Sequence, residues 1–138
     1  MLIEFTPDFF IHVAEIDAQH RELINRLNDV GALMGRSPAA SKEETEKTLE
    51  FLSSYVIKHF SDEEALQRKI GYPLYKEHLQ DHQYYLREVD KLKEEYKKNG
   101  YSTQFEFQLN KSIILWILEH IMTADRNIGT YIREKTLR

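Results

Sequence analysis

The chain of 138 residues contains no cysteine, which excludes disulfides, thiolate metal sites and cysteine nucleophiles. It has only five glycines and three prolines, and this scarcity of turn residues favours a few long elements over many short strands. No apolar run reaches the length of a membrane span, and the first residues lack the features of a signal peptide. At a net charge of −4, no basic stripe stands out that would bind nucleic acid. We therefore expect a cytoplasmic protein with neither a membrane nor nucleic acid as partner.

Turn-forming residues divide the chain at three places. The breakers are "GRSPAAS" at 35–41, "GYP" at 71–73 and "NGYST" at 99–103, and the periodic segments between them are long enough for helices of many turns. The length is that of one domain with a sizeable core. We therefore expect a single domain over residues 1–138, with an N-terminal arm at 1–16 and helices at about 17–35, 42–70, 73–99 and 103–136.

Individual residues at these boundaries favour the predicted helix ends. Ser41 and Thr103 are each followed three residues later by Glu, which is the pattern of a capping box at a helix start. Pro73 suits a first helical position, and Gly100 suits the residue just past a helix end. Asp17 is a candidate cap for the first helix.

Apolar residues recur along each predicted helix at alternating steps of three and four, as in amphipathic helices. Long helices with such stripes, joined by short loops, predict an all-α fold, an antiparallel up-down-up-down four-helix bundle. Most stripe members are Leu, Ile or Val, which we expect to form the core. Some stripe positions, or positions at a stripe's edge, instead carry ionisable residues, namely His20, His59, Glu63, His78, His82, His120 and Asp125.

These seven residues are predicted to converge on one layer of the bundle. In an up-down-up-down topology, the starts of the first and third helices and the ends of the second and fourth share one end. At ~1.5 Å rise per residue, the candidates on the first three helices fall within about 5–16 Å of that end. Residues four apart can reach one point, but His120 and Asp125 are five apart. That pair must straddle the inner face, or the helix must be locally distorted.

Such a cluster is costly in a purely structural bundle, because a buried, unpaired carboxylate costs several kcal/mol. A metal would remove that cost, and seven ligands are too many for one tetrahedral zinc. If Glu63 and Asp125 each bridge, then with five imidazoles and a bridging oxide or hydroxide they fill all but one position around two octahedral ions. Ligands without sulfur suit iron, manganese or zinc, and iron alone among these combines readily with dioxygen.

The ligand candidates stand in the segments "EIDAQH", "HFSDEE", "HLQDH" and "WILEHIMTAD". In this order and spacing they closely resemble the hemerythrins, especially the bacterial ones, from about residue 5 to about residue 132. The resemblance implies a non-haem di-iron centre that binds dioxygen reversibly for storage, transport or delivery, rather than an enzyme. It implies two iron ions bridged by Glu63, Asp125 and an oxo or hydroxo group. It assigns His78, His82 and His120 to one iron, and His20 and His59 to the other, which keeps the vacancy.

The resemblance also implies that Phe60, Trp116, Ile117 and Ile121 line the oxygen pocket and keep water and protons out. His12 stands where the family leads us to expect Gly. It could be an extra ligand, a hydrogen-bond partner of a ligand or a surface residue, and we expect it on the surface because it lies outside the stripes.

Two other functions remain open. Oxygen-activating enzymes of the ferritin-like class use Glu-x-x-His pairs and carboxylate-rich shells, which this chain lacks, although oxidase or peroxidase chemistry at the same irons is an alternative. The other is a module that senses oxygen or redox state, which would normally belong to a longer chain with an output segment. The sequence does not identify a protein partner.

Overall fold

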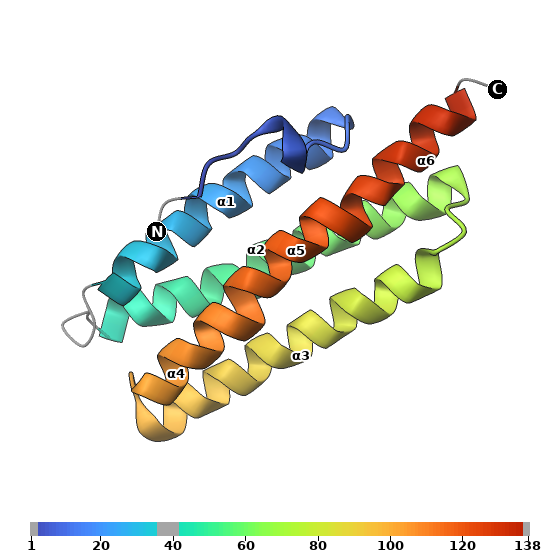
Figure 1. Ribbon diagram of the computed structural model, residues 1–138. Coiled ribbons are helices and arrows are strands. Elements are labelled where there is room, and N and C mark those ends of the chain that lie inside the picture. The colour runs from blue at the N-terminus through green and yellow to red at the C-terminus, as the bar shows by residue number, and fades with distance from the viewer. Residues whose placement is uncertain (1–2, 36–41, 137–138) are drawn as a thin grey trace.

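The computed structural model describes residues 3–35 and 42–136, and all of the elements it assigns there are helical. Three of the long segments are regular helices, and the fourth is a continuous rod of α-helical and π-helical pieces (Figure 1). The elements are η1 (Pro7–Phe9), α1 (Ala14–Gly35), α2 (Lys42–Ile70), α3 (Tyr75–Asn99), α4 (Thr103–Gln108), η2 (Leu109–Leu115), α5 (Trp116–His120), η3 (Ile121–Asp125) and α6 (Arg126–Thr136).

The elements from α4 to α6 (residues 103–136) form one continuous helical segment, the fourth rod. The long helices pack side by side, with α2 between α1 and α3, and with the fourth rod against α3. Figure 1 shows the end of α1, the start of α2 and the α3–α4 connection at one end of the molecule, and the α2–α3 connection and the end of α6 at the other. At that second end, the hydroxyl of Tyr131 donates to the carbonyl of Gly71, 3.4 Å away. The ammonium group of Lys135 donates to the carbonyl of Ile70 at 3.0 Å.

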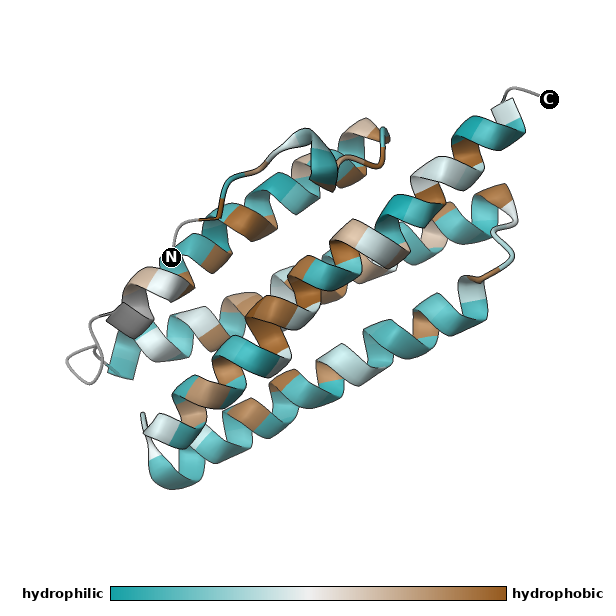
Figure 2. Cartoon of the chain, in the orientation of Figure 1, coloured by the Kyte–Doolittle hydropathy of each residue, from teal (hydrophilic) through white to brown (hydrophobic). Residues whose placement is uncertain are grey.

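The apolar stripes form the interior. Buried Leu, Ile and Val members occur on each helix, for example Leu27, Leu52, Val89 and Ile113. Figure 2 shows α3 largely hydrophilic with hydrophobic residues interspersed, as an amphipathic helix requires. Within the described ranges, none of these helices is both long and apolar enough to cross a membrane.

Two predicted helix starts differ from the structure. The first helix begins at Ala14 rather than at 17, so Asp17 lies inside its first turn. The third helix begins at Tyr75 rather than at Pro73. The buried ring of Tyr72 packs on the ring of Tyr131, with centroids 5.4 Å apart, and Pro73 stays in the turn before the helix.

The fourth helix is capped one residue earlier than predicted. The hydroxyl of Ser102, rather than that of Thr103, accepts the backbone N–H of Phe105 at 3.0 Å. At the end of α3, Gly100 is the cap as predicted, with φ of 67° and its N–H donating to the carbonyl of Tyr96 at 2.7 Å. The predicted cap at Ser41 lies outside the described residues.

The segment before α1 folds back along that helix (Figure 1). The side-chain amide of Asn28 exchanges two hydrogen bonds with the backbone of Ile3, at 2.7 and 2.8 Å. Nearer the helix, the carboxylate of Asp17 accepts the backbone N–H groups of Ile11 at 2.8 Å and His12 at 3.1 Å. His12 is exposed and has a positive φ of 65°, the left-handed conformation that glycine adopts at least cost. That conformation explains why the family resemblance places Gly at this position.

Candidate metal centre

The structure brings all seven ionisable stripe residues together in two adjoining groups. Within each group, one nitrogen or carboxylate oxygen from every residue lies within 4.8 Å of the others. Glu63 and Asp125 belong to both groups, which share these two carboxylates. The first group consists of Glu63, His78, His82, His120 and Asp125, and the second of His20, His59, Glu63 and Asp125.

Glu63, on α2, presents one oxygen to each group. Its Oε1 lies 2.8 Å from Nε2 of His78 and 3.1 Å from Nε2 of His82. Its Oε2 lies 3.5 Å from Nε2 of His59 and 3.6 Å from Nε2 of His20. The carboxylate therefore spans the boundary between the two groups.

Asp125, on the fourth rod, divides its oxygens in the same way. Its Oδ1 lies 2.8 Å from Nε2 of His78 and 3.2 Å from Nε2 of His120. Its Oδ2 lies 3.0 Å from Nε2 of His20. Every imidazole thus faces the cluster through Nε2, as it would if it shared a metal ion with a bridging carboxylate.

The cluster is buried away from solvent, and many of its polar atoms lack hydrogen bonds. All seven side chains belong to residues no more than 5% exposed. Both oxygens of Glu63 and of Asp125 have no hydrogen-bond partner of acceptable geometry, although imidazole nitrogens lie close by. The Nε2 atoms of His20, His59 and His82 also have no hydrogen-bond partner. Buried polar groups normally have hydrogen-bond partners. Carboxylate oxygens and imidazole nitrogens that lack such partners and converge on shared points therefore fit a metal site.

A distortion of the fourth helix aligns its two contributions. His120 ends α5, and Asp125 ends the π-helical segment η3 that follows it. At the end of that segment, the N–H of Arg126 donates to the carbonyl of Ile121, five residues back. Because a π-helical turn joins residues five apart, it brings His120 and Asp125 onto one face, and such bulges are frequent at functional sites. Of the two geometries expected from the sequence, the structure has the local distortion.

Hydrogen bonds on the far side of two imidazoles were not predicted from the sequence. Nδ1 of His59 lies 2.7 Å from Oε1 of Gln19, and Nδ1 of His82 lies 2.7 Å from Oε2 of Glu64. Gln19 precedes His20 in the sequence and Glu64 follows Glu63, but each bonds a histidine on another helix. Helical periodicity within one segment contains no signal for such pairs.

Two of the predicted pocket residues, Phe60 and Trp116, lie against the three-histidine group. The ring of Phe60 stacks on His82 with centroids 3.7 Å apart, and Trp116 stacks on His120 at 4.8 Å. Ile117 and Ile121 are fully buried in the core. Tyr85, which the sequence analysis did not single out, packs on both Phe60 and Trp116, and its buried hydroxyl lacks a hydrogen-bond partner.

Within the cluster, protonated imidazoles offset the negative charge of the two carboxylates. Burial lowers the pKa of His20 and His78, but the carboxylates of Asp125 and Glu63 outweigh it and raise both pKa values to about 10. Burial lowers the pKa of His59 to about 4. Burial and mutual repulsion raise the pKa of Glu63, yet contacts with His20, His78 and His82 hold it below its ordinary value. Burial lowers the pKa of His82 too, but its hydrogen-bonding contacts with Glu63 and Glu64 outweigh burial and raise it. In the chain without metal, protonated imidazoles therefore face the two carboxylates.

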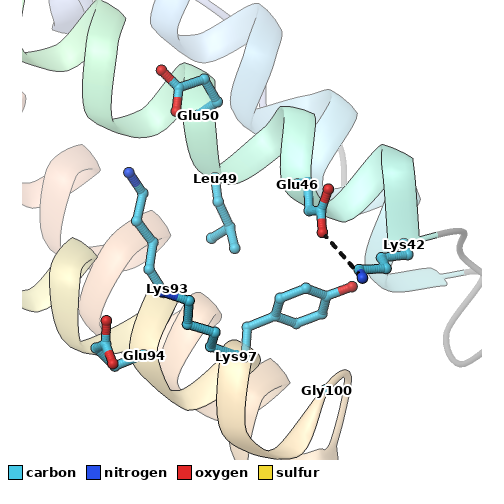
Figure 3. A pocket seen from close by; sticks show the side chains of 9 residues that line it. Lys42, Glu46, Leu49, Glu50, Lys93, Glu94, Lys97 and Gly100 are labelled. Carbon is cyan, nitrogen blue, oxygen red and sulfur yellow. Dashed lines mark ion pairs between the residues drawn. The ribbon is translucent and has the colours of Figure 1, made fainter.

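A groove elsewhere on the molecule does not share these residues. It lies between the first half of α2 and the last turns of α3, with Leu49 pointing into it (Figure 3). Its cations and anions are equal in number, so it offers no unbalanced charge to a ligand. The charged lining residues are Lys42, Glu46, Glu50, Lys93, Glu94 and Lys97.

Comparison with known families identifies the domain. The family model described as the hemerythrin HHE cation binding domain matches residues 12–132, which include every member of the cluster. The chain belongs to the hemerythrin family. The hemerythrin resemblance inferred from the sequence motifs is thereby confirmed, and the domain is a cation-binding one.

Several curated proteins named bacteriohemerythrin are similar to this hemerythrin-family chain. The one from Campylobacter jejuni is 31% identical over 121 residues, covering 87% of each chain. The one from Stenotrophomonas maltophilia is 24% identical over 132 residues, covering 96% of this chain and 82% of the relative. The one from Pseudomonas aeruginosa is 29% identical over 121 residues, covering 86% and 73%. No solved structure matches.

Proposed function

We propose that this chain binds dioxygen reversibly at a non-haem di-iron centre, for oxygen storage, transport or delivery. The observation that carries the proposal is the pair of adjoining groups that share Glu63 and Asp125. A pair of bridging carboxylates between two imidazole clusters is a site for two ions, not one. The relatives named bacteriohemerythrin support the same function.

The residues present fit two iron ions. The unsatisfied oxygens of Glu63 and Asp125 would bridge the ions, together with an oxo or hydroxo group. When bound, the iron pair supplies the electrons that dioxygen takes up on binding. His78, His82 and His120 would hold one ion, and His20 and His59 the other.

The chain's own residues would protect this chemistry from water. Phe60 and Trp116 cover the imidazoles of His82 and His120 by stacking on them. Ile117 and Ile121 add buried apolar side chains without hydrogen-bonding groups. An apolar surround of this kind controls solvent access to a metal and favours a small neutral ligand over ions.

Binding rather than catalysis is supported by the ligand set. Five imidazoles and two carboxylates make a nitrogen-rich shell, whereas oxygen-activating di-iron bundles use carboxylate-rich shells with Glu-x-x-His pairs.

The helix connections in Figure 1 support an antiparallel up-down-up-down bundle with an N-terminal arm along α1, forming a single domain.

The test is an iron count and an absorption spectrum of the purified chain, reduced without air and then exposed to oxygen. We expect two irons per chain and visible bands that appear with oxygen and vanish when oxygen is removed. A direct and stable change to a ferric spectrum would contradict reversible binding and favour an oxidase, a peroxidase or a redox sensor.

The ligand assignment has its own test in Glu63→Gln, which keeps the shape of the side chain but removes its charge. Because Glu63 is shared by both groups, we expect the bound iron to fall below two per chain, together with the melting temperature of the iron-loaded protein. His12→Asn is the control, since His12 is exposed and Asn tolerates its positive φ. A Glu63→Gln chain that keeps two irons and normal oxygen binding would refute the assignment.

A further inference from the structure

The three-histidine group has carboxylates behind its imidazoles. His82 uses Nδ1 to donate a hydrogen bond to Oε2 of Glu64, 2.7 Å away. That carboxylate is largely shielded, because the Glu64 side chain is 17% exposed. Behind His120, Oδ2 of Asp81 lies 3.9 Å from Nδ1. Two of the three imidazoles in this group therefore have a negative charge close behind them.

The two-histidine group has a neutral amide in the corresponding place. Nδ1 of His59 donates to Oε1 of Gln19 at 2.7 Å. The amide is fixed in this orientation because its Nε2 donates to Oδ2 of Asp62 at 2.8 Å, and Lys58 donates to the same oxygen at 2.9 Å. Nδ1 of His20 is buried without a hydrogen-bond partner in the described structure.

This difference changes how strongly each group holds a cation. A carboxylate that accepts the Nδ1–H bond raises the basicity of the imidazole, and loss of such a partner typically reduces metal affinity about 10- to 100-fold. A neutral amide orients the ring but adds no charge. The group with Glu64 also has three imidazoles, against two in the group with Gln19.

We propose that the two metal positions differ in affinity and fill in a fixed order, and that Glu64 and Gln19 widen the difference. The position of His78, His82 and His120 fills first and empties last. The position of His20 and His59 fills second and releases its ion first. The inference rests on the proposed di-iron centre.

Chelator competition on the iron-loaded chain, kept free of oxygen, tests the order. Native mass spectrometry counts the species with two, one and no irons as chelator is added. We expect two separate steps with a one-iron species between them. Glu64→Gln should lower the chelator concentration of the final step about 10- to 100-fold and leave the first step in place.

The reciprocal change is the double variant Gln19→Glu with Asp62→Asn, which conserves net charge. The two positions exchange amide and carboxylate. The carboxylate then stands at position 19, where it faces His59, and the amide at position 62 can donate a hydrogen bond to that carboxylate. We expect the first step to move to higher chelator concentration, with the final step unchanged. Glu77→Gln is the control, because it removes an exposed charge from α3 and should move neither step.

The outcomes separate this inference from the proposed function. If both irons leave in one step, the fixed order is wrong, although two bound irons leave the di-iron centre standing. If the variants shift both steps equally, or lower the melting temperature of the metal-free chain, Glu64 and Gln19 act only structurally and their assigned role is wrong. Fewer than two irons in the starting protein would overturn both proposals.

Discussion

Glu63 and Asp125 show how a fold accommodates two buried carboxylates. Burial and their proximity to each other raise the pKa of Glu63, but imidazole contacts hold it in the ionised form. Without metal, the compensation comes from His20 and His78, whose pKa values are raised to about 10. At neutral pH these two rings are protonated and balance the two carboxylates. Cations that bind the cluster must therefore displace those protons.

The pocket assignment can be tested at Ile117, which is 1% exposed and packs in the core. Ile117→Thr keeps the β-branched shape but introduces a hydroxyl, which would attract water to the proposed iron pair. We expect the iron count to stay at two and the oxygenated form to oxidise faster, measured as the decay of its visible spectrum in air.

Ile117→Val is the matched control, because it shortens the side chain without adding a polar atom. It should oxidise more slowly than the Thr variant. Equal oxidation rates in the wild type and Ile117→Thr would show that Ile117 does not exclude water from the site.

The candidate ligands could be predicted from the sequence because each interrupts a stripe of Leu, Ile and Val or lies at its edge. His82 and Glu63 occupy positions where periodicity calls for an apolar residue, so their chemistry is visible without a structure. Gln19 and Glu64 could not be found in this way. Both lie beside ligand positions in the sequence, yet each bonds an imidazole on another helix, and only the packing of the helices brings them together.

At the scale of elements, the fourth helix shows what periodicity can and cannot predict. The five-residue step from His120 to Asp125 fits a regular helix poorly, and the structure resolves the misfit with the π-helical segment η3. The earlier π-helical segment, η2, has no such signal, because its buried residues, Leu109, Ile113 and Ile114, pack as ordinary core. The errors at Pro73 and Thr103 have the same origin, since docking of Tyr72 and capping by Ser102 decide those boundaries.

Close packing of α6 against the N-terminal segment can be tested at Gly129. A Cβ at this position would lie 2.4 Å from the backbone oxygen of Ile11, whose N–H is held by Asp17. Ala in an exposed helix interior is favoured over Gly by about 1 kcal/mol, but this contact reverses the expectation. We expect Gly129→Ala to lower the free energy of unfolding by about 1–3 kcal/mol, the usual cost of overpacking.

Urea unfolding followed by circular dichroism measures this difference. Thr130→Ala, at the neighbouring exposed position, is the control and should change stability little. A Gly129→Ala chain more stable than the wild type would mean that the segment before α1 is not packed against α6 in solution.

At the scale of the whole molecule, the cluster joins every long helix at one layer. His20 comes from α1, His59 and Glu63 from α2, His78 and His82 from α3, and the remaining two candidate ligands from the fourth rod. Ions bound only by the folded arrangement stabilise it by mass action, so metal binding and folding are coupled. The metal-free chain must instead rely on the protonated imidazoles, and this gives the two forms different responses to pH.

The metal-free chain should become less stable as the pH rises from about 6.5 towards 10. His20 and His78 have folded-state pKa values of about 10, against 6.5 in an unfolded chain, so their contribution is complete below pH 6.5 and disappears as they lose protons. His59, with a pKa of about 4, is already neutral in this range. The iron-loaded chain has no such loss, because its imidazoles bind metal in their neutral form.

Thermal unfolding of both forms, buffered in steps from pH 6.5 to about 9.5, separates these effects. We expect the melting temperature of the metal-free chain to fall across the range, and the gap between the two forms to widen, because fewer protons compete with the metal. His12→Asn should follow the wild type, since its imidazole lies outside the cluster. A metal-free melting temperature that rises with pH would mean that His20 and His78 are neutral in the folded chain. The two carboxylates would then have no positive partner within the cluster, and the balance of charge derived from their contacts would be wrong.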